Sequence, residues 1–387
     1  MRTRSPRTRS PGVLEKLNVG VVGAAGRGAS FRAAFEAHPM TRIHAVCDVR
    51  EDLLAEAAQR LGASEMYVDY EEMLERSDVD AVVIGTPMPL HTPQAIQALQ
   101  RDIHVLSEVT AAVSVQECQA LVAAARQSRA VYMMAENDTY IKPNVLVKEL
   151  VRRGLFGDLY YAEGEYIHEL KELNEITPWR RQWQTGIDGI TYGTHSLGPI
   201  LQWLSASPAG SSDLVVRVCC AGSGHHYLDP RGDPYENQDT CVMLAQTARG
   251  ALIKIRVDML SERPHAMTNY SLQGTRGCYE SARSPGERGK IWLAGFCADK
   301  NVWLDLADLE ADYMPEMWRQ PPEAALRAGH GGGDYFEVLD FVRSIVDGVP
   351  CPIGIHQAMD MTLPGLISQA SVAAGGAWME VPDSRMW

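Results

Sequence analysis

Short apolar runs alternate with helix-like segments along the first third of the chain. Leu17 to Val22 is apolar and leads directly into Gly23, which predicts a buried strand. Helical periodicity follows as far as about Ala37. The same criteria predict further strands at 43–47, 79–84, 104–106 and 131–134, and further helices at 51–61, 69–74, 92–100 and 114–126. This alternation is typical of parallel βαβ units in an α/β domain.

The pattern changes after Asn137. A predicted helix at 143–153 is followed by strand-like runs at 159–167, 213–220, 239–245, 251–259 and 268–273, whose spacing predicts a mostly antiparallel sheet. Additional helices are predicted at 195–204, 334–346 and about 366–374. We therefore expect two domains, 17–138 and 139–387, preceded by a disordered basic tail at 1–16.

Composition and charge exclude several classes of partner. The net charge is −13, and the first ten residues hold four Arg and no acid, so the excess of acid lies in the rest of the chain. An acidic chain of this kind is not expected to bind nucleic acid, because such binding depends on neutralising phosphates with basic side chains. No apolar stretch approaches the roughly 20 residues that span a bilayer. The eight Cys form no C-x-x-C pair, so we expect reduced thiols and a cytoplasmic location.

A glycine-rich loop carries the first functional prediction. Gly23-Ala24-Ala25-Gly26-Arg27-Gly28 follows a predicted strand and opens a helix, whose backbone N–H groups suit a pyrophosphate. Ala25 stands at the usual second glycine position, so Gly26 is expected to supply the close backbone approach. Asp48 ends the second strand, 20 residues after Gly28, and its carboxylate would bind ribose hydroxyls and repel a 2′-phosphate. The sequence thus predicts a Rossmann domain that binds NAD.

Together with Gly85-Thr86-Pro87, His91 and His104-Val105-Leu106-Ser107-Glu108, this loop resembles the Gfo/Idh/MocA oxidoreductases. That family joins an N-terminal Rossmann domain to a C-terminal α/β domain with an open, mostly antiparallel sheet. The resemblance covers nearly the whole chain beyond residue 17. With the loop, it implies a cofactor site made of Gly23, Ala25, Gly26, Arg27, Gly28, Asp48, Thr86, Pro87, His91, Glu108 and Asn137.

The chain departs from most dehydrogenases of that family at one informative place. They carry Glu-Lys-Pro after the fifth strand, where the Lys helps hydride transfer, whereas this chain has Glu108-Val109-Thr110. The same Glu-Val occurs in the NAD-dependent glycoside hydrolases of family 109, whose type activity is α-N-acetylgalactosaminidase. The block from Tyr192 to Pro199 and the block from His330 to Asp334 also resemble that branch, and they are the specific part of the match.

The resemblance implies an oxidation–elimination route. NAD+ takes a hydride from C3 of the sugar, the resulting ketone acidifies C2–H, a base removes that proton, and the C1 substituent leaves. Water then adds and NADH returns the hydride, so the cofactor is regenerated in each turnover. His195 is the first candidate for the base at O3, because its usual pKa lies near neutrality. It opens a predicted helix, whose dipole is expected to keep the imidazole neutral. Tyr192, three residues earlier, is a candidate for binding the sugar or sharing the proton.

Tyr166 is the candidate for removing the C2 proton, with positive charge from Arg180 or Lys171 helping the phenol to ionise. His168 lies two residues further along the same strand, so it should share the face of Tyr166 and is an alternative base. Arg180 is also a candidate for holding the substrate or the cofactor carboxamide. Trp179 is a candidate for stacking on a sugar, although its i, i+4 spacing to Trp183 is equally typical of packing.

The Gly-rich loop at 330–334 gives two further substrate candidates. In the family this loop approaches the active site, so His330 and Asp334 are expected there, although Asp334 is equally suited to cap the following helix. We expect no metal site, because His225 and His226 with Asp229 and Asp233 match no standard ligand spacing.

Three functions remain open from the sequence. The favoured hypothesis is an NAD-dependent glycoside hydrolase acting on a small-molecule glycoside. The second is an NAD-dependent sugar dehydrogenase that forms a 3-keto sugar. The third is a non-catalytic NAD-binding protein. The family resemblance also implies a homo-oligomer that pairs through the open sheet of the C-terminal domain.

Overall fold

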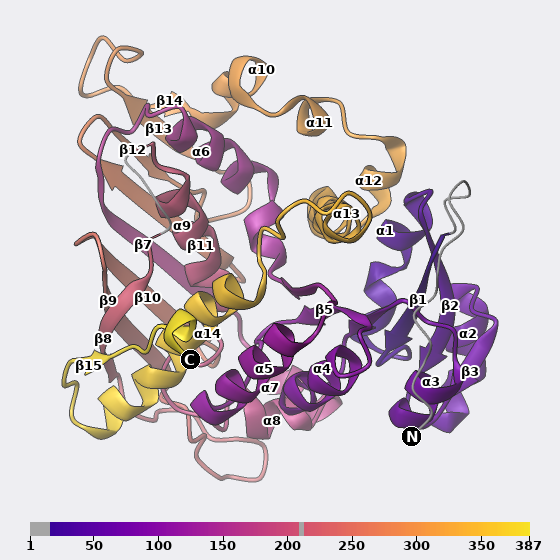
Figure 1. The fold of residues 1–387 in the computed structure, drawn as a ribbon. Helices are drawn as coiled ribbons and strands as arrows, with labels where there is room; N and C mark the ends of the chain where they lie inside the picture. Colours follow the sequence, from indigo (N-terminus) through magenta and orange to yellow (C-terminus); the bar gives the residue numbers. More distant parts are fainter. Residues whose placement is uncertain (1–15, 209–212) are drawn as a thin grey trace.

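The computed structural model describes residues 16–208 and 213–387. The basic tail predicted to be disordered lies outside the described residues, apart from Lys16. The described chain is built around two sheets, one in each part of the sequence, with helices packed between them (Figure 1).

The first sheet has six strands in the order β3-β2-β1-β4-β5-β6, and every neighbouring pair is parallel. This is the strand order of a Rossmann domain. The strands are β1 (Leu17–Val22), β2 (Thr41–Cys47), β3 (Glu65–Tyr67), β4 (Ala81–Ile84), β5 (His104–Glu108) and β6 (Tyr132–Ala135). The helices between them are α1 (Arg32–Ala37), α2 (Glu51–Leu61), α3 (Tyr70–Arg76), α4 (His91–Leu99) and α5 (Val115–Gln127).

The sequence prediction of this domain is confirmed apart from two local differences. The pattern missed β3, which has three residues and no buried one. The helix after the glycine loop begins as a 3-10 turn, η1 (Arg27–Phe31), before α1 continues it. All residues of β1 are buried, as expected for a central strand covered on both faces.

The second sheet has nine strands in the order β14-β13-β12-β11-β7-β10-β9-β8-β15. It is mostly antiparallel, as predicted, and the described exception is the parallel pair β7 and β10. Its strands are β7 (Leu159–Ile167), β8 (Val215–Gly222), β9 (Thr240–Thr247), β10 (Leu252–Asp258), β11 (Met267–Gly274), β12 (Gly277–Glu280), β13 (Lys290–Leu293), β14 (Leu304–Asp305) and β15 (Met379–Glu380). Burial alternates strictly along β9, so one face of the sheet is packed and the other is more open.

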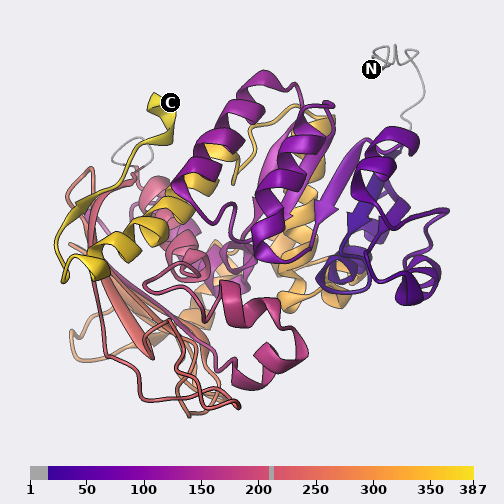
Figure 2. The same ribbon diagram turned by 90° about the horizontal axis from the view of Figure 1, so that it is seen from below.

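Helices α6 (Lys142–Arg152), α9 (Thr194–Ala206), α13 (Gly333–Val346) and α14 (Ile355–Ala373) connect the two sheets. Helix α9 packs on β7, β10 and β11, while α13 packs on α1 and α14 packs on both α5 and β8. Figure 2 shows α14, in yellow, running beside the helices of the first domain. The last part of the chain therefore returns to pack on the first domain.

Five short helices complete the described elements: α7 (Lys171–Ile176), α8 (Trp179–Trp183), α10 (Glu310–Tyr313), α11 (Glu316–Arg319) and α12 (Glu323–Arg327). Within residues 16–208 and 213–387, no helix has both the length and the apolar character needed to cross a membrane.

Candidate active site

The glycine loop lies at the carboxyl edge of the first sheet and is closely packed. A Cβ at Gly23 would lie 2.5 Å from the carbonyl oxygen of Gly85, and Gly23 has a positive φ of 77°. A Cβ at Gly28 would lie 2.8 Å from the oxygen of Val22. At Gly26, by contrast, the nearest atom would be 3.4 Å away. Gly23 and Gly28 therefore keep the turn close to β1 and β4, which is the cradle that a dinucleotide pyrophosphate requires.

Asp48 follows β2 and is buried beside this loop. Its Oδ2 accepts a hydrogen bond from the amide of Ala25 at 2.8 Å, and its Oδ1 accepts one from the amide of Arg50 at 3.0 Å. The carboxylate thus holds the loop at the end of the second strand, where an adenosine ribose is expected. Its predicted contact with the ribose is compatible with this position.

The turn after β4 carries Thr86, Pro87 and His91. The His91 ring is buried, with Nδ1 2.9 Å from the oxygen of Thr110 and Nε2 2.9 Å from the oxygen of Thr86. Both ring nitrogens therefore face backbone carbonyls, and His91 supports the turns around the cofactor site. Its place in the cofactor site stays a prediction. Thr86 donates its hydroxyl to Gln94 at 2.6 Å, and Pro87 begins the 3-10 turn η2 (Met88–Leu90).

Two more predicted cofactor residues meet across the sheet edge. Arg27 Nε donates to Glu108 Oε1 at 2.6 Å, which joins the glycine loop to the end of β5. Asn137 is buried in the 3-10 turn η3 (Asn137–Tyr140), directly after β6. The predicted cofactor residues thus lie on consecutive strand ends of one sheet edge, where open α/β sheets bind ligands.

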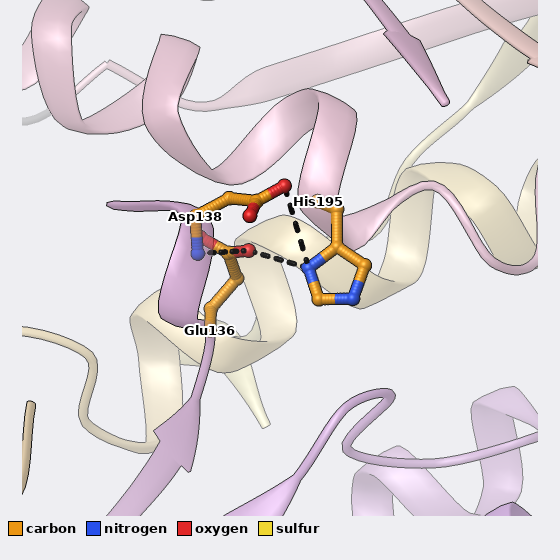
Figure 3. Close-up of side chains that lie close together, drawn as sticks. All are labelled: Glu136, Asp138 and His195. Carbon is orange, nitrogen blue, oxygen red and sulfur yellow. Dashed lines mark hydrogen bonds and ion pairs between the residues drawn. The ribbon is translucent and has the colours of Figure 1, made fainter. Parts of the chain in front are cut away.

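A second cluster forms where α9 begins. Figure 3 shows the imidazole of His195, from the first turn of α9, pointing toward Glu136 and Asp138 beside η3. His195 Nδ1 lies 2.8 Å from Glu136 Oε1 and 3.9 Å from Asp138 Oδ2. The His195 side chain is 12% exposed and that of Glu136 is 0% exposed. An imidazole held by a buried carboxylate has a fixed ring orientation, as a general base needs.

The charges around His195 contradict its predicted neutral state. Burial alone would lower its pKa, but the charges of Asp138 and Glu136 outweigh burial and raise the pKa of His195 to about 9. Burial and the neighbouring Glu136 raise the pKa of Asp138 to about 6. A helix dipole acts with about 0.3–1 kcal/mol, which is less than two carboxylates can supply at these distances. The cluster therefore holds a proton at neutral pH.

Tyr166, His168 and Tyr192 complete this cluster around His195. The Tyr166 hydroxyl lies 2.7 Å from His168 Nδ1, so the two residues share one face as predicted. Burial raises the pKa of Tyr166 well above its usual value, and burial with nearby positive groups lowers the pKa of His168 to about 4. A neutral His168 can accept the phenol hydrogen bond, so the two alternative bases form one pair. The Tyr166 ring centroid lies 5.7 Å from that of His195 and 5.4 Å from that of Tyr192.

Of the two cations considered for Tyr166, only Arg180 is placed to act on it. Arg180 lies in α8, acts to lower the pKa of Tyr166, and places its guanidinium 4.4 Å from the ring centre of Trp179. Lys171 instead forms an ion pair with Glu262 at 2.6 Å, so its proposed role is wrong. Trp179 is partly exposed and its ring supports Arg180.

The Gly-rich loop brings His330 toward the cluster. His330 has a positive φ of 53°, and its Nδ1 lies 2.7 Å from Asp334 Oδ1. Asp334 is fully buried at the second position of α13, where it makes no cap hydrogen bond, so the capping alternative is wrong. The loop lies against η3, because a Cβ at Gly333 would be 3.3 Å from the oxygen of Tyr140 and 3.5 Å from that of Asn137.

Sequence reasoning did not identify Glu136 and Asp138 as partners of His195. The available signal was their position directly after a predicted strand, where functional residues of α/β sheets gather. Within the described residues, these three side chains also form the one group whose ligand atoms would be close enough for a cation. Glu136 already accepts hydrogen bonds from the backbone amides of Asp138 and Thr139 and from the Thr139 hydroxyl. His226 belongs to the pair of histidines that the sequence analysis weighed as metal ligands. Its Nδ1 contacts Asp239.

Two family models match adjacent parts of the chain. Residues 140–386 match the C-terminal domain of glycosyl hydrolase 109. Residues 17–136 match the NAD-binding Rossmann fold of the Gfo/Idh/MocA oxidoreductase family.

Curated relatives span nearly the whole chain. A glycosyl hydrolase family 109 protein of Saccharopolyspora erythraea is 31% identical over 95% of this chain and 83% of its own length. An alpha-N-acetylgalactosaminidase of Shewanella oneidensis is 28% identical over 96% of this chain and 85% of its own length. These similarities extend over both domains.

Solved structures share the fold at lower identity. Levoglucosan dehydrogenase in complex with NADH and levoglucosan has a TM-score of 0.80 and 22% identity, covering 95% of this chain and 100% of that chain. The WlbA dehydrogenase of Bordetella pertussis, in complex with NADH and UDP-GlcNAcA, has a TM-score of 0.76 and 20% identity, covering 96% and 99%. At this identity the likeness concerns the fold alone.

Proposed function

Because the chain belongs to the glycosyl hydrolase 109 family and its first domain is an NAD-binding Rossmann domain, we propose that it is an NAD-dependent glycoside hydrolase. The proposed route is transient oxidation at C3 of the sugar, elimination at C1, addition of water and re-reduction. Bound NAD supplies the hydride acceptor and donor for this route. The alpha-N-acetylgalactosaminidase among the relatives makes an α-linked N-acetylgalactosamine the first substrate to test.

One observation carries the proposal: two separate acid–base groups lie side by side. His195 is held by Glu136 on one side, and the Tyr166–His168 pair lies beside it, with ring centroids of Tyr166 and His195 5.7 Å apart. Oxidation of a hydroxyl needs one acceptor, whereas elimination from the neighbouring carbon needs a second. The spacing of the two rings suits bases that act on adjacent positions of one sugar ring.

The residues have distinct tasks in this proposal. The imidazole of His195 takes the proton of the sugar hydroxyl at C3, and Glu136 fixes its orientation and stabilises the imidazolium that forms. The Tyr166–His168 pair takes the proton at C2 and returns it after water has added. Arg180 acts to lower the pKa of both Tyr166 and Tyr192, which helps a phenolate to form. The buried ring cluster limits access of bulk water to these groups.

A sugar dehydrogenase is the second candidate, because the fold also matches levoglucosan dehydrogenase over nearly its full length. Val109 stands where most dehydrogenases of the family carry the catalytic Lys, which favours the hydrolase. The two candidates differ in net chemistry. Hydrolysis leaves the cofactor oxidised, whereas dehydrogenation releases one NADH for each sugar.

The test is a screen of 4-nitrophenyl α- and β-glycosides with and without added NAD+, read at one wavelength for nitrophenol and at another for NADH. The hydrolase is supported by nitrophenol release that needs NAD+ and produces no net NADH. Stoichiometric NADH without nitrophenol would establish the dehydrogenase instead. His195→Ala should retain NAD+ binding and lose turnover, and unchanged turnover in that variant would refute the role of His195.

A further inference from the structure

An exposed histidine lies directly against the proposed base at C2. The ring centroid of His265 is 4.6 Å from that of His168, and the two ring planes make an angle of 81°. His168 in turn lies 2.7 Å from the Tyr166 hydroxyl through its Nδ1. Three rings therefore follow one another from the buried Tyr166, through the half-buried His168, to the exposed His265. The function proposed above gives His265 no task.

His265 belongs to the loop 259–266, which joins β10 to β11. The beginning of this loop is tied to the strand end that carries His168, because the His168 amide donates to the backbone oxygen of Asp258 at 3.0 Å. The carboxylate of Asp258 accepts the amide of Ser261 at 3.0 Å and the hydroxyl of Ser261 at 2.7 Å. The first turn of the loop is thus fixed beside the proposed base.

Lys171 provides a second anchor for the same loop. Its Nζ donates to the backbone oxygen of Leu260 at 3.1 Å and to Glu262 at 2.6 Å. The sequence suggested Lys171 as a charge acting on Tyr166, whereas these contacts make it an anchor of the loop. Lys171 follows His168 by three residues, so both anchors join the loop to the segment of the base and keep His265 against His168.

The ring of His168 has two orientations to choose between. Rotation of an imidazole by half a turn about its Cβ–Cγ bond exchanges the places of Nδ1 and a carbon, and this torsion has a broad, roughly two-fold profile. In the structure Nδ1 faces the Tyr166 hydroxyl. Contacts between the edge of one aromatic ring and the face of another are directional, so the His265 ring favours one orientation of His168 over the other.

The orientation matters because the Tyr166–His168 pair acts as one base. As the C2–H bond breaks, its electron pair stays on the sugar and expels the C1 substituent, while its proton joins the Tyr166 oxygen. The phenolic proton moves to Nδ1 of His168, which becomes an imidazolium. After water has added its oxygen at C1, the proton returns to C2, and the leaving group takes the proton that the water loses. This exchange works only while Nδ1 faces the phenol.

The electrostatics of the pair agree with this assignment. Burial lowers the pKa of His168 to about 4, and the charges of His265 and Arg180 act in the same direction. A neutral imidazole can accept the phenolic proton, whereas an imidazolium cannot. The neighbours of His168 therefore keep it in the form that the step requires.

We propose that His265 is a positioning residue for the base at C2, and that its ring holds the His168 imidazole with Nδ1 toward the Tyr166 hydroxyl. This inference rests on the proposed glycosidase function and adds one residue to it. His265 acts through His168 and has no contact with the reacting atoms in this assignment.

Three variants separate the place of the ring from its charge. His265→Ala removes the ring, and His265→Phe keeps an aromatic ring without the nitrogens. His225→Ala, which removes an exposed histidine from another loop, is the matched control. His265→Ala should lower kcat at least about tenfold, His265→Phe should recover turnover to within about threefold of the wild type, and the control should leave kcat unchanged.

Isotope effects identify the step that changes. The substrate is the chromogenic glycoside found in the screen, deuterated at C2 or at C3, with the NAD+-loaded full chain. In His265→Ala the C2 isotope effect on kcat should rise and the C3 isotope effect should fall, and bound NADH should accumulate, because oxidation then outpaces elimination. Turnover retained in His265→Ala, equal losses in His265→Ala and His265→Phe, or a loss without this change in the isotope effects would overturn the proposal.

A spectroscopic arm needs no turnover, so it separates the position of His168 from the reaction. Nitrogen NMR of the NAD+-loaded chain with isotope-labelled histidines reports which ring nitrogen carries the proton, and His168→Gln identifies the signals of His168. His168 should be protonated at Nε2 alone in the wild type and in His265→Phe, and should show both tautomers in His265→Ala. That result would stand even if no glycoside were cleaved, in which case only the hydrolase assignment fails. Both tautomers in the wild type, or a single one in His265→Ala, would refute the role of His265.

Discussion

Replacing Asp138 with asparagine is expected to lower the pKa of His195 and to shift the pH dependence of turnover toward acid. Asp138 contributes the largest interaction that raises this pKa, across 3.9 Å between Oδ2 and His195 Nδ1. Asparagine has the same shape and can still accept the hydroxyl of Tyr270. The substitution therefore removes a charge with little change in packing.

The magnitude follows from the position of the charge. Asp138 and Glu136 raise the pKa of His195 to about 9, against the opposing effect of burial. An opposite charge within 4–6 Å shifts a pKa by about 1–3, so Asp138→Asn should bring the pKa of His195 to roughly 6–8. At pH 7 the neutral fraction of the imidazole would then rise from about 1% to at least about 10%. Because a base must be neutral to accept a proton, kcat/KM at low pH should rise in the same proportion.

The assay is the pH profile of kcat/KM between pH 5 and 10 with saturating NAD+, using the chromogenic glycoside found in the screen. The rising limb should move to lower pH by at least one unit in Asp138→Asn. Asp340→Asn is the control, because Asp340 receives the hydroxyl of Tyr140 at 3.0 Å and does not contact the His195 cluster. An unchanged limb, or one that moves to higher pH, would refute the electrostatic reasoning.

Three further predictions test the surroundings of the site. Burial and neighbouring carboxylates raise the pKa of Glu337 well above its usual value. Above about pH 4.3 the unfolded chain therefore releases a proton that the folded chain keeps. The free energy of unfolding then falls as the pH rises. Glu337→Gln should weaken the pH dependence of the free energy of unfolding and raise the denaturation midpoint at pH 7. The control Glu323→Gln, at an exposed position, should do neither. A wild-type midpoint that rises between pH 5 and 8 would contradict the prediction. Asp48→Asn should weaken NAD+ binding by roughly tenfold, about 1.4 kcal/mol, and reduce the preference for NAD+ over NADP+ in fluorescence titrations. An unchanged ratio of the two dissociation constants would exclude the contact between Asp48 and the ribose. Gly28→Ala should lower stability by more than about 1 kcal/mol and impair NAD+ binding, because its Cβ would meet Val22 O at 2.8 Å. Gly26→Ala should lower stability much less in the same melts, because its Cβ would meet no protein atom closer than 3.4 Å.

The sequence predicted the elements with strong periodicity and missed those without it. The strands from Leu17 to Val22 and from Leu159 to Ile167 are long and apolar or alternating, and the structure confirms both. The strand Glu65–Tyr67 and the two-residue strands β14 and β15 have too few residues to show a period of two. Such strands are defined by pairing with a neighbour, which local sequence does not encode.

In the candidate active site, too, features encoded by neighbouring residues were predicted, and contacts between distant segments were not. The position of His195 at the start of a helix was predictable from its own segment. Its partner Glu136 lies 59 positions away and is brought near by packing of α9 on η3, so the pairing could not be deduced from either segment. The error about the charge of His195 follows directly, because the prediction included the helix dipole and omitted the carboxylates. Short-range rules therefore locate functional residues better than they determine protonation.

The electrostatics of the site also bear on the choice between the two enzymatic functions. Val109 removes the cation that family dehydrogenases place after the fifth strand, while Glu136 and Asp138 favour a protonated His195. The positive charge is thus carried by a proton that can leave and return, rather than by a permanent side-chain cation. Tyr166 and His195 are only 4% and 12% exposed, so in the proposed cycle protons taken from the sugar would exchange slowly with solvent. A one-way oxidation needs to discharge its proton to solvent, whereas a cycle that reduces the sugar again needs the proton kept in place. This retention supports the hydrolase, and it predicts that the protons removed at O3 and C2 return to the same sugar within one turnover.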